Sequence, residues 1–206
     1  LNSAVIDEII TSNPMDKIKN EEKPKRRRTE RAFLTIDELK ILSQTDFHNA
    51  TLKKAFLFSC FCGLRHSDIV ALTWGNLKKG KVGKMELHMT QQKTQEILSL
   101  PLSKEALKQL PVRGKVPDTE KVFKGLISLG RTNEILPKWA AKAGIQKHIT
   151  FHSARHTHAT MMITLGADLY TVSKLLGHTN IQTTQIYAKI VDESKEKAID
   201  LIPDIT

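Results

Sequence analysis

The sequence has few cysteines and no long hydrophobic run. Cys60 and Cys62 are its only cysteines. The C-x-C spacing fits neither a metal site nor a redox motif, and two cysteines cannot form a disulfide framework. Both lie in the apolar stretch FLFSCFCGLR, so we expect buried, reduced thiols in an intracellular protein. No apolar run approaches about 18 residues and none resembles a signal peptide, so we expect no membrane span.

Acidic residues are outnumbered by basic ones. The 206 residues include 32 Lys and Arg against 22 Asp and Glu, which gives a formal charge of +10 and a pI near 9.6. This surplus favours a polyanionic partner, most simply a nucleic acid, although it does not distinguish DNA from RNA. Because 40% of the residues are hydrophobic, the chain can form a sizeable core, and we expect one domain plus an appendage.

The composition divides the chain into three segments. Residues 1–18 carry apolar residues at helical spacing that stop at Ser12-Asn13-Pro14, and we expect the C-terminal end of a missing N-terminal domain. Residues 19–31, KNEEKPKRRRTER, contain no apolar side chain and indicate a basic interdomain linker. Residues 32–206 are predicted to form the main domain, with a helical tail at its C-terminus.

The basic run within the linker has two interpretations. It is either a solvated tether or a strap that lies along a phosphate backbone. We favour the strap, because other features of the chain also indicate DNA. Its predicted DNA-binding residues are Lys25, Arg26, Arg27 and Arg28.

The main domain is predicted to be mainly α-helical with one small antiparallel β-sheet, an α+β fold. Thr35 and Glu38 form a capping box at a helix start, and the next helix is apolar nearly all round until Gly63, so it should be central. Another helix is expected to start at His66 or Ser67. Further helices are expected at about 103–110, 128–142, 152–165, 169–176 and 180–200.

From residue 84 the hydrophobic period changes to two, which indicates strands. Met85, Leu87 and Met89 alternate with polar residues, and a second extended run follows at Ile97–Leu100. The polar stretch TQQKTQE separates the two runs, so we expect a β-hairpin with Lys93 near its tip.

Several side chains in separate stretches could do chemistry: Arg65 in CGLRHSD, Lys93, His152 and Arg155 in HSARHTHAT, and His178 with Tyr187 in LLGHTNIQTTQIYAKI. His152 and Arg155 lie three residues apart near a helix start, where free N–H groups and the helix dipole favour phosphate. Each residue alone also has an ordinary explanation. Arg65 could pair with Asp68, Lys93 could be a solvated turn residue, and Tyr187 could be a packed or helix-surface phenol.

Two further possibilities carry less weight. His152, His156 and His158 could suggest a metal site, but His158 lies off the face shared by the other two and no acid or cysteine completes a ligand set. Tyr170 lies in a helix between Asp168 as N-cap and a glycine at its end, and we interpret it as structural.

Together, these stretches resemble the tyrosine recombinases, the phage-integrase family. GLRHSDIVALTW resembles the family's first arginine box and QQKTQEILSLPLS its hairpin lysine, while HSARHTHAT matches H-x-x-R-H-T-x-A-T. LLGHTNIQTTQIYAKI matches L-G-H followed by T-x-x-Y, and the order and spacings fit over residues 29 to 190. Ala154 stands where a leucine is common. The family clamps DNA between two domains, and residues 1–18 would retain only the last helix of the N-terminal core-binding domain.

The resemblance implies catalytic roles for Arg65, Lys93, His152, Arg155, His178 and Tyr187, with Asp68 behind them. Tyr187 would attack a DNA phosphodiester and form a 3′-phosphotyrosyl link. The arginines and the lysine would favour the phenolate and stabilise the transition state. Lys93 would also protonate the 5′-oxygen, and because a hairpin tip is mobile we expect it to reach that atom only when DNA is bound.

The remaining implied roles are supporting ones. His178 would donate a hydrogen bond to the phosphate, and His152 would accept a proton from Tyr187 or orient it. Asp68 would hold Arg65 or His152.

Implied partners and cofactors follow from this chemistry. Strands rejoin when a 5′-hydroxyl attacks the phosphotyrosyl link, so we expect no cofactor and no metal, and the sequence shows no Walker motif. The resemblance implies double-stranded DNA as partner, a monomer when free and a homo-tetramer on DNA. It also implies accessory DNA-bending or directionality factors, and work at the bacterial nucleoid in the cytoplasm, not at a membrane.

Alternatives concern both the task and the chemistry. We expect an integrase or transposase of a mobile element, such as a conjugative or mobilisable one. A type IB topoisomerase-like enzyme or an Xer-type chromosome-resolution enzyme would share the chemistry. GADLYTVSKLLGHTNIQTTQIY could instead form a helix-turn-helix of a DNA-binding regulator, which would need neither the lysine nor the arginine boxes. The amphipathic tail AKIVDESKEKAIDLI packs either on its own domain or on a neighbouring protomer.

Overall fold

The computed structural model describes residues 2–18, 31–80 and 83–187, and the chain divides into two compact units, Leu1–Glu30 and Arg31–Thr206. In the first unit, α1 (Asn2–Ile6) is followed by a short 3-10 helix, η1 (Pro14–Lys17), which Asn13 caps. The helix predicted to run to Ser12 therefore ends earlier, because Glu8 has a positive φ of 57° that a helix cannot continue through. Residues 19–30 of the predicted linker, with the basic run 25–28, lie outside the described residues, while Arg31 begins the second unit.

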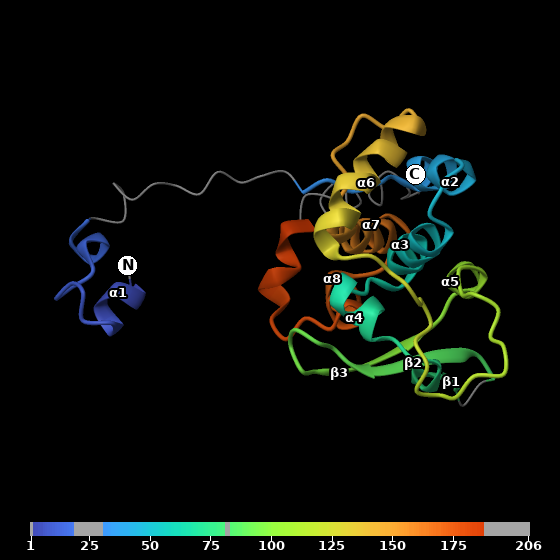
Figure 1. Cartoon of the computed structure of the whole chain (residues 1–206), viewed down its shortest axis with the longest axis horizontal. Coiled ribbons are helices and arrows are strands. Elements are labelled where there is room, and N and C mark those ends of the chain that lie inside the picture. The colour runs from blue at the N-terminus through green and yellow to red at the C-terminus, as the bar shows by residue number, and fades with distance from the viewer. Residues whose placement is uncertain (1, 19–30, 81–82, 188–206) are drawn as a thin grey trace, which may run out of the picture. The chain divides into compact units, whose positions relative to one another are not determined.

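The helices of the second unit pack around α3 (Ala50–Cys62), as the sequence predicted. Its side chains are buried on nearly all sides, and α7 (Phe151–Thr164) lies against it (Figure 1). Cys60 and Cys62 are both free and buried within it. The surrounding helices are α2 (Ile36–Gln44), α4 (His66–Ala71), α5 (Lys104–Lys108), α6 (Leu129–Lys142) and α8 (Leu169–Leu176).

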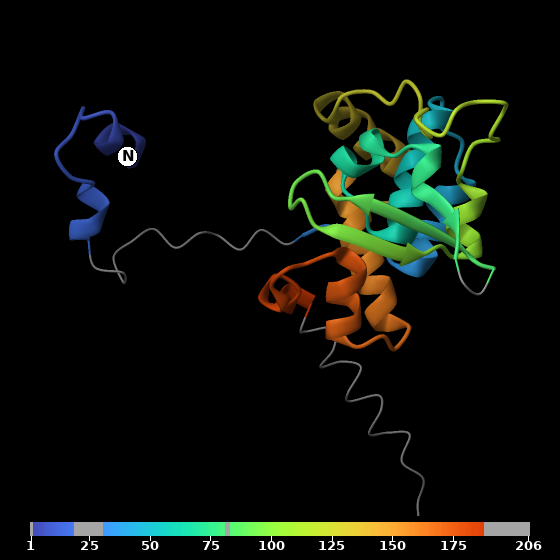
Figure 2. The same cartoon turned by 90° about the horizontal axis from the view of Figure 1, so that it is seen from below.

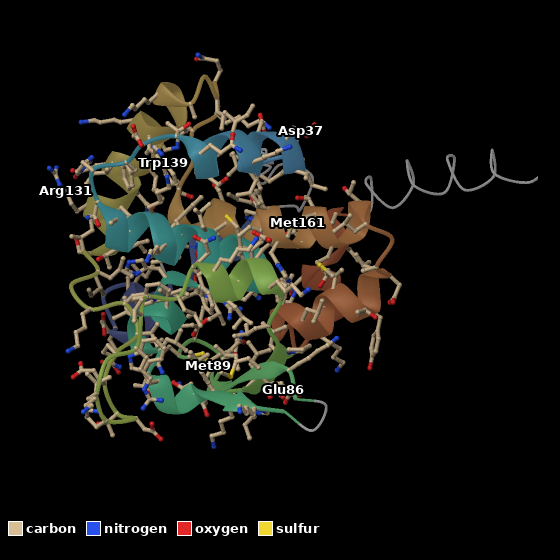
Figure 3. All side chains as sticks on the ribbon, turned by 90° about the vertical axis from the view of Figure 1, so that its right-hand side faces the viewer. Asp37, Glu86, Met89, Arg131, Trp139 and Met161 are labelled. Atoms are coloured by element: carbon tan, nitrogen blue, oxygen red, sulfur yellow. The ribbon has the colours of Figure 1, made fainter. Side chains whose placement is uncertain are left out.

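The predicted capping box at the start of α2 is confirmed. The Thr35 hydroxyl accepts a hydrogen bond from the Glu38 amide at 3.2 Å, and the Glu38 carboxylate accepts one from the Thr35 amide at 2.8 Å. Trp139 of α6 stacks on Phe47 with ring centroids 4.6 Å apart. In Figure 3 Trp139 lies at the end of the unit opposite Met89, so the two mark the helical and the sheet side of one core.

The predicted β-hairpin is confirmed and belongs to a three-stranded antiparallel sheet along one edge of the unit (Figures 1 and 2). Its strands are β1 (Leu77–Lys79), β2 (Met85–Thr90) and β3 (Ile97–Pro101), with β2 in the centre. Leu87 pairs with Leu100 and Met89 with Leu98, and all four are buried. The period of two thus marks the core face. Strand β1 was missed because it is only three residues long and largely exposed, so it has no period to detect.

The helix predicted at 180–200 is wrong over its described part. Residues 180–187 form two 3-10 helices, η3 (Ile181–Thr183) and η4 (Gln185–Tyr187). The Asn180 side chain accepts a hydrogen bond from the Gln182 amide at 2.8 Å, a local bond that competes with an α-helix. The rest of this predicted helix and the C-terminal tail lie outside the described residues. Over the residues that the structure describes, no helix combines the length and the apolar character needed to cross a bilayer.

Candidate active site

Arg155 lies at the centre of the candidate site and connects three helices. Its Nη1 donates to the Gly63 carbonyl at 2.8 Å, and its Nη2 donates to the Leu176 carbonyl at 2.7 Å. The side chain of α7 therefore ties together the C-terminal ends of α3 and α8. Burial, and then the charge of Arg65, lower the pKa of Arg155 to about 10, so the guanidinium remains charged at neutral pH.

Arg65 caps the start of α4 and stands beside a buried acid. Asp68 accepts the Arg65 backbone N–H at 3.1 Å, while the Arg65 Nη1 lies 3.9 Å from its carboxylate, too far for a hydrogen bond. Within the described part of the chain, that buried Nη1 has no hydrogen-bond partner. Asp68 also accepts the Gln92 amide at 2.8 Å, so it joins the first arginine to the base of the hairpin.

The β2–β3 turn is fixed at its base and exposed at its tip. Gln91 is fully buried, donates through Nε2 to the Leu176 carbonyl at 3.1 Å and accepts the Thr94 hydroxyl at 3.0 Å. The turn therefore lies beside the end of α8, as both Figure 1 and Figure 2 show. Lys93 itself is exposed, and no hydrogen bond or ion pair to it occurs among the described residues.

Two glycines allow these elements to approach. Gly63 has a φ of +71°, and a Cβ there would lie 2.8 Å from Leu176 Cδ2 and 2.9 Å from His158 Cδ2. Gly177 has a φ of +64°, and a Cβ there would lie 2.7 Å from Gln91 Oε1. Each glycine is thus needed for both its backbone conformation and the space that it leaves.

His158 belongs to the core and not to the site. Its Nδ1 lies 3.3 Å from the Cys60 carbonyl, and burial lowers its pKa to about 4. It therefore points away from the face of α7 that carries His152 and His156, as the sequence predicted. Among the residues described, no cluster of three or more His, Cys, Asp or Glu side chains could hold a metal ion.

Tyr187 is buried, and its hydroxyl contacts a histidine that the sequence prediction did not assign to it. Only 6% of Tyr187 is exposed, and it belongs to a buried cluster with residues of α7 and α8, namely Ala159, Ile163, Val172 and Leu176. Its Oη lies 2.5 Å from Nδ1 of His156, which is itself buried. Burial raises the pKa of Tyr187 to about 12 and lowers that of His156 to about 3. At neutral pH the tyrosine therefore keeps its proton and donates a hydrogen bond to the imidazole.

His152 reaches solvent at the start of α7 and has no hydrogen bond to Tyr187 among the described contacts. Its ring stands edge-on to that of His156, with centroids 4.6 Å apart. The buried part of the ring, and then the charges of Arg155 and Arg31, lower its pKa. Sequence reasoning considered His156 only as a metal ligand. That His156 shares a helix face with His152 was apparent from their spacing of four residues, but nothing in the sequence indicates that Tyr187, 31 residues further on, lies against it.

His178 follows the C-terminal end of α8 and is half-buried. Its backbone N–H donates to the Ser173 carbonyl at 3.0 Å, and its Nδ1 lies 2.8 Å from the hydroxyl of the buried Thr184. Burial, and then the charges of Arg155 and Arg65, lower its pKa to about 4. The imidazole is therefore neutral at neutral pH, with one nitrogen engaged by Thr184.

The structure thus brings several of the predicted residues near one another. The charge of Arg155 acts on Tyr187 and His178, and that of Arg65 acts on Arg155 and His178. Lys93 is exposed on the adjoining turn, and its charge acts on His152. The predicted strap, Lys25–Arg28, lies outside the described residues. Tyr170, interpreted as structural, is 60% exposed beneath the Lys174 amine, so it is not part of the core.

A model of the phage integrase family matches residues 32–194. The chain belongs to the phage integrase family. A tyrosine recombinase of Pseudothermotoga lettingae is 30% identical to it over 192 residues, which cover 91% of this chain and 65% of that protein. The tyrosine recombinase XerC of Caldanaerobacter subterraneus subsp. tengcongensis is 30% identical over 206 residues, which cover 95% of this chain and 57% of that protein. The chain therefore spans less than two thirds of these relatives.

Solved structures show the same fold. The lambda integrase dimer bound to a COC′ core site matches with a TM-score of 0.67 at 20% identity, over 90% of this chain and 68% of that one. The catalytic domain of bacteriophage HP1 integrase matches with a TM-score of 0.60 at 22% identity, over 84% of this chain and 96% of that one. The predicted family and the α+β fold of a tyrosine recombinase catalytic domain are therefore confirmed.

Proposed function

We propose that this phage integrase family chain is the catalytic part of a site-specific DNA recombinase that cleaves and rejoins strands through a 3′-phosphotyrosyl intermediate. The observation that carries the proposal is the buried charge beside Tyr187. Arg65 and Arg155 lie close enough for their charges to interact, and in the described part of the chain Asp68 is the carboxylate beside them. Arg65 Nη1 is buried without a hydrogen-bond partner among the described residues. A buried positive surplus is costly unless an anion completes it, and a phosphodiester would do so.

Each side chain then has a defined task. Tyr187 Oη attacks phosphorus, the bond from phosphorus to the 5′-oxygen breaks, and the 5′-oxygen takes a proton from Lys93. Arg65 and Arg155 bind the non-bridging oxygens, for which the planar guanidinium is suited, and each such donor is worth ~3–4 kcal/mol in the transition state.

His178 is suited to bind the phosphate as a neutral donor. When the Thr184 hydroxyl donates to Nδ1, the proton of the neutral imidazole lies on Nε2. That N–H can donate to a phosphate oxygen, as the family resemblance implies. Asp68, buried between Arg65 and the Gln92 amide, holds the first arginine and the hairpin in register.

For the biological task, we propose DNA integration or excision for a mobile element, such as a conjugative transposon. The motif style supports it, and the Tn1549 transposon integrase bound to circular-intermediate DNA matches with a TM-score of 0.63, at 19% identity over 90% of this chain and 69% of that one. Chromosome resolution of the Xer type is the second candidate, because XerC proteins are among the relatives at 30% identity. Strand exchange at the element's ends, compared with a chromosomal resolution site, would separate the two.

Partners follow from this proposal. The substrate is double-stranded DNA, and the working form is a homo-tetramer on that DNA, with accessory bending or directionality factors. Since the relatives named above are bacterial, we place the reaction in the bacterial cytoplasm at the nucleoid.

The test is a covalent trap with the full-length protein. Nicked duplexes carrying the element's ends lose a short strand after cleavage, which leaves the protein attached to DNA in denaturing gels. We expect an adduct with wild type and with Tyr170→Phe, and none with Tyr187→Phe. An adduct that survives Tyr187→Phe would remove Tyr187 as nucleophile. Noncovalent binding with no adduct would favour the DNA-binding regulator.

A further inference from the structure

The hydroxyl of Tyr187 has one close polar neighbour among the described residues, and that neighbour is His156. The distance of 2.5 Å between Oη and Nδ1 is that of a strong hydrogen bond, and both residues are at least nine-tenths buried. Water therefore has little access to this hydroxyl. His152, to which the family resemblance assigns the role of proton acceptor, is instead exposed and stands edge-on to the His156 ring, with no hydrogen bond to Tyr187 among the described contacts.

The pair is held by elements on both sides. His156 lies in the middle of α7, directly after Arg155, and its carbonyl accepts the Thr160 hydroxyl at 3.0 Å. Tyr187 is held by its amide, which donates to the Thr184 carbonyl at 3.1 Å, and by its place in a buried cluster with residues of α7 and α8. The contact is thus a product of the fold and not of a free side-chain rotation.

We propose that His156 holds the Tyr187 hydroxyl in place and accepts its proton when that hydroxyl attacks the phosphodiester. The inference rests on the proposed function and deepens it. The O–H bond of Tyr187 breaks and its proton moves to Nδ1, while the Oη–phosphorus bond forms. The bond to the 5′-oxygen breaks, and that oxygen takes a proton from Lys93. On rejoining, the 5′-hydroxyl attacks phosphorus and gives its proton to Lys93, the Oη–phosphorus bond breaks, and the imidazolium returns the proton to Tyr187.

The charges around His156 explain why the proton does not move before DNA binds. His152 and Arg155 face the ring from α7, Arg31 from the start of the unit, and His178 from the turn after α8. After burial, these groups are what lowers the pKa of His156 to about 3. A bound phosphodiester brings a negative charge among the same groups, which favours the imidazolium and so raises the basicity of His156.

Two variants of His156 distinguish a residue that accepts the proton of Tyr187 from one that only positions its hydroxyl. In His156→Asn the side-chain oxygen can occupy the place of Nδ1 and accept the same hydrogen bond, but it cannot take the proton. We expect this variant to bind DNA like wild type and to cleave ~10²–10⁴-fold more slowly at neutral pH. Its rate should rise with pH, because hydroxide must now remove the proton, and in His156→Ala added imidazole should restore part of the rate.

The leaving group provides the second arm of the experiment. In a substrate with sulfur in place of the bridging 5′-oxygen, the departing thiolate needs no proton. Lys93→Ala should be rescued on that substrate, whereas His156→Asn should not, because its defect lies at the nucleophile. A His156→Asn rate within about threefold of wild type with a parallel pH profile would overturn the proposal. Rescue of His156→Asn by the 5′-sulfur substrate would also overturn it. So would a rate increase on adding imidazole to His152→Ala but not to His156→Ala.

A measurement without DNA keeps the two proposals distinguishable. Tyr170 and Tyr187 are the only tyrosines, so in Tyr170→Phe the tyrosinate absorbance reports Tyr187 alone. Burial raises the pKa of Tyr187 to about 12. The hydrogen bond to His156 also favours the neutral phenol, so adding His156→Ala, which removes both the acceptor and part of the cover, should move this pKa toward its ordinary value. An unchanged titration would overturn the proposed contact. An adduct missing in wild type would instead count against the recombinase function.

Discussion

Arg155 and Lys93 are cations proposed for the same phosphate, yet the structure holds them in opposite ways. Arg155 is 3% exposed and donates to backbone carbonyls at the ends of two other helices. Lys93 is exposed at the tip of a turn whose base is fixed by Gln91 and Asp68. The comparison shows a division of labour. In the proposed mechanism, Arg155 binds the phosphate from within the core, whereas Lys93 delivers a proton from an exposed turn.

The largest expected effect follows from removing Arg155. In Arg155→Ala two buried carbonyls lose charge-assisted hydrogen bonds, each worth ~1.5–3 kcal/mol. We expect the free energy of unfolding to fall by about 3–5 kcal/mol, together with loss of cleavage. Urea denaturation would measure the free energy of unfolding, and the adduct assay would measure cleavage. A variant that is inactive but as stable as wild type would contradict the structural half of its role.

The second-largest effect is expected from acidification, which should lower the free energy of unfolding through the buried His158. The pKa of His158 is about 4 in the folded protein and ~6.5 when unfolded, so below pH ~6.5 the unfolded chain binds the additional proton. The contribution of neutral His158 to the free energy of unfolding is fully present above that pH. It falls by about 3 kcal/mol as the pH is lowered toward about 4. Urea denaturation of wild type at several pH values would show this loss. The same series on His158→Gln should be flatter, and an equally steep curve would contradict the assignment.

The close approach of α3, α7 and α8 can be tested at Gly63. Gly63→Ala should destabilise by about 2–4 kcal/mol, because strain from a positive φ adds to overlap with Leu176 and His158. Gly83 is a matched control, since its φ is +72° but no atom of the described residues lies within 4 Å of a Cβ there. Gly83→Ala should cost only about 1–2 kcal/mol in thermal or urea unfolding. Equal costs at the two positions would mean that the packing around Gly63 is not tight.

The smallest effect on stability is expected at the hairpin. Lys93→Ala should leave the free energy of unfolding within about 0.5 kcal/mol, while it slows cleavage ~10²–10⁴-fold. Gln91→Ala should cost about 1 kcal/mol and slow cleavage less, because the lysine remains but its turn is less firmly held. Both cleavage defects should diminish on the 5′-sulfur substrate. If the cleavage defect of Gln91→Ala is as large on the 5′-sulfur substrate, then Gln91 does not act by positioning Lys93.

How much the sequence could predict depended on whether a feature is local. The capping box at Thr35, the limits of α8 and the alternation in β2 each follow from neighbouring residues, and the structure confirms them. The motif spacings likewise identified the family, which the family model confirms. These features needed no knowledge of which distant segments meet.

The rest depended on contacts between distant residues. Neither the junction at the Leu176 carbonyl nor the pairing of His156 with Tyr187 has a signal in any window of sequence, since they join residues 21 to 85 positions apart. The helix predicted at 180–200 failed over residues 180–187 for a related reason. The buried Thr184 is engaged by His178, and the turns there bring Tyr187 to His156 instead of continuing a helical period.

Tyr187 is the residue that we propose becomes covalently joined to DNA. One measurement tests this directly. The adduct formed by the full-length wild-type protein on a nicked duplex is digested with protease and nuclease, and the peptide that retains a nucleotide is sequenced by mass spectrometry. We predict a single modified peptide with the nucleotide on Tyr187. A nucleotide on the exposed Tyr170, or on any residue other than Tyr187, would contradict the account.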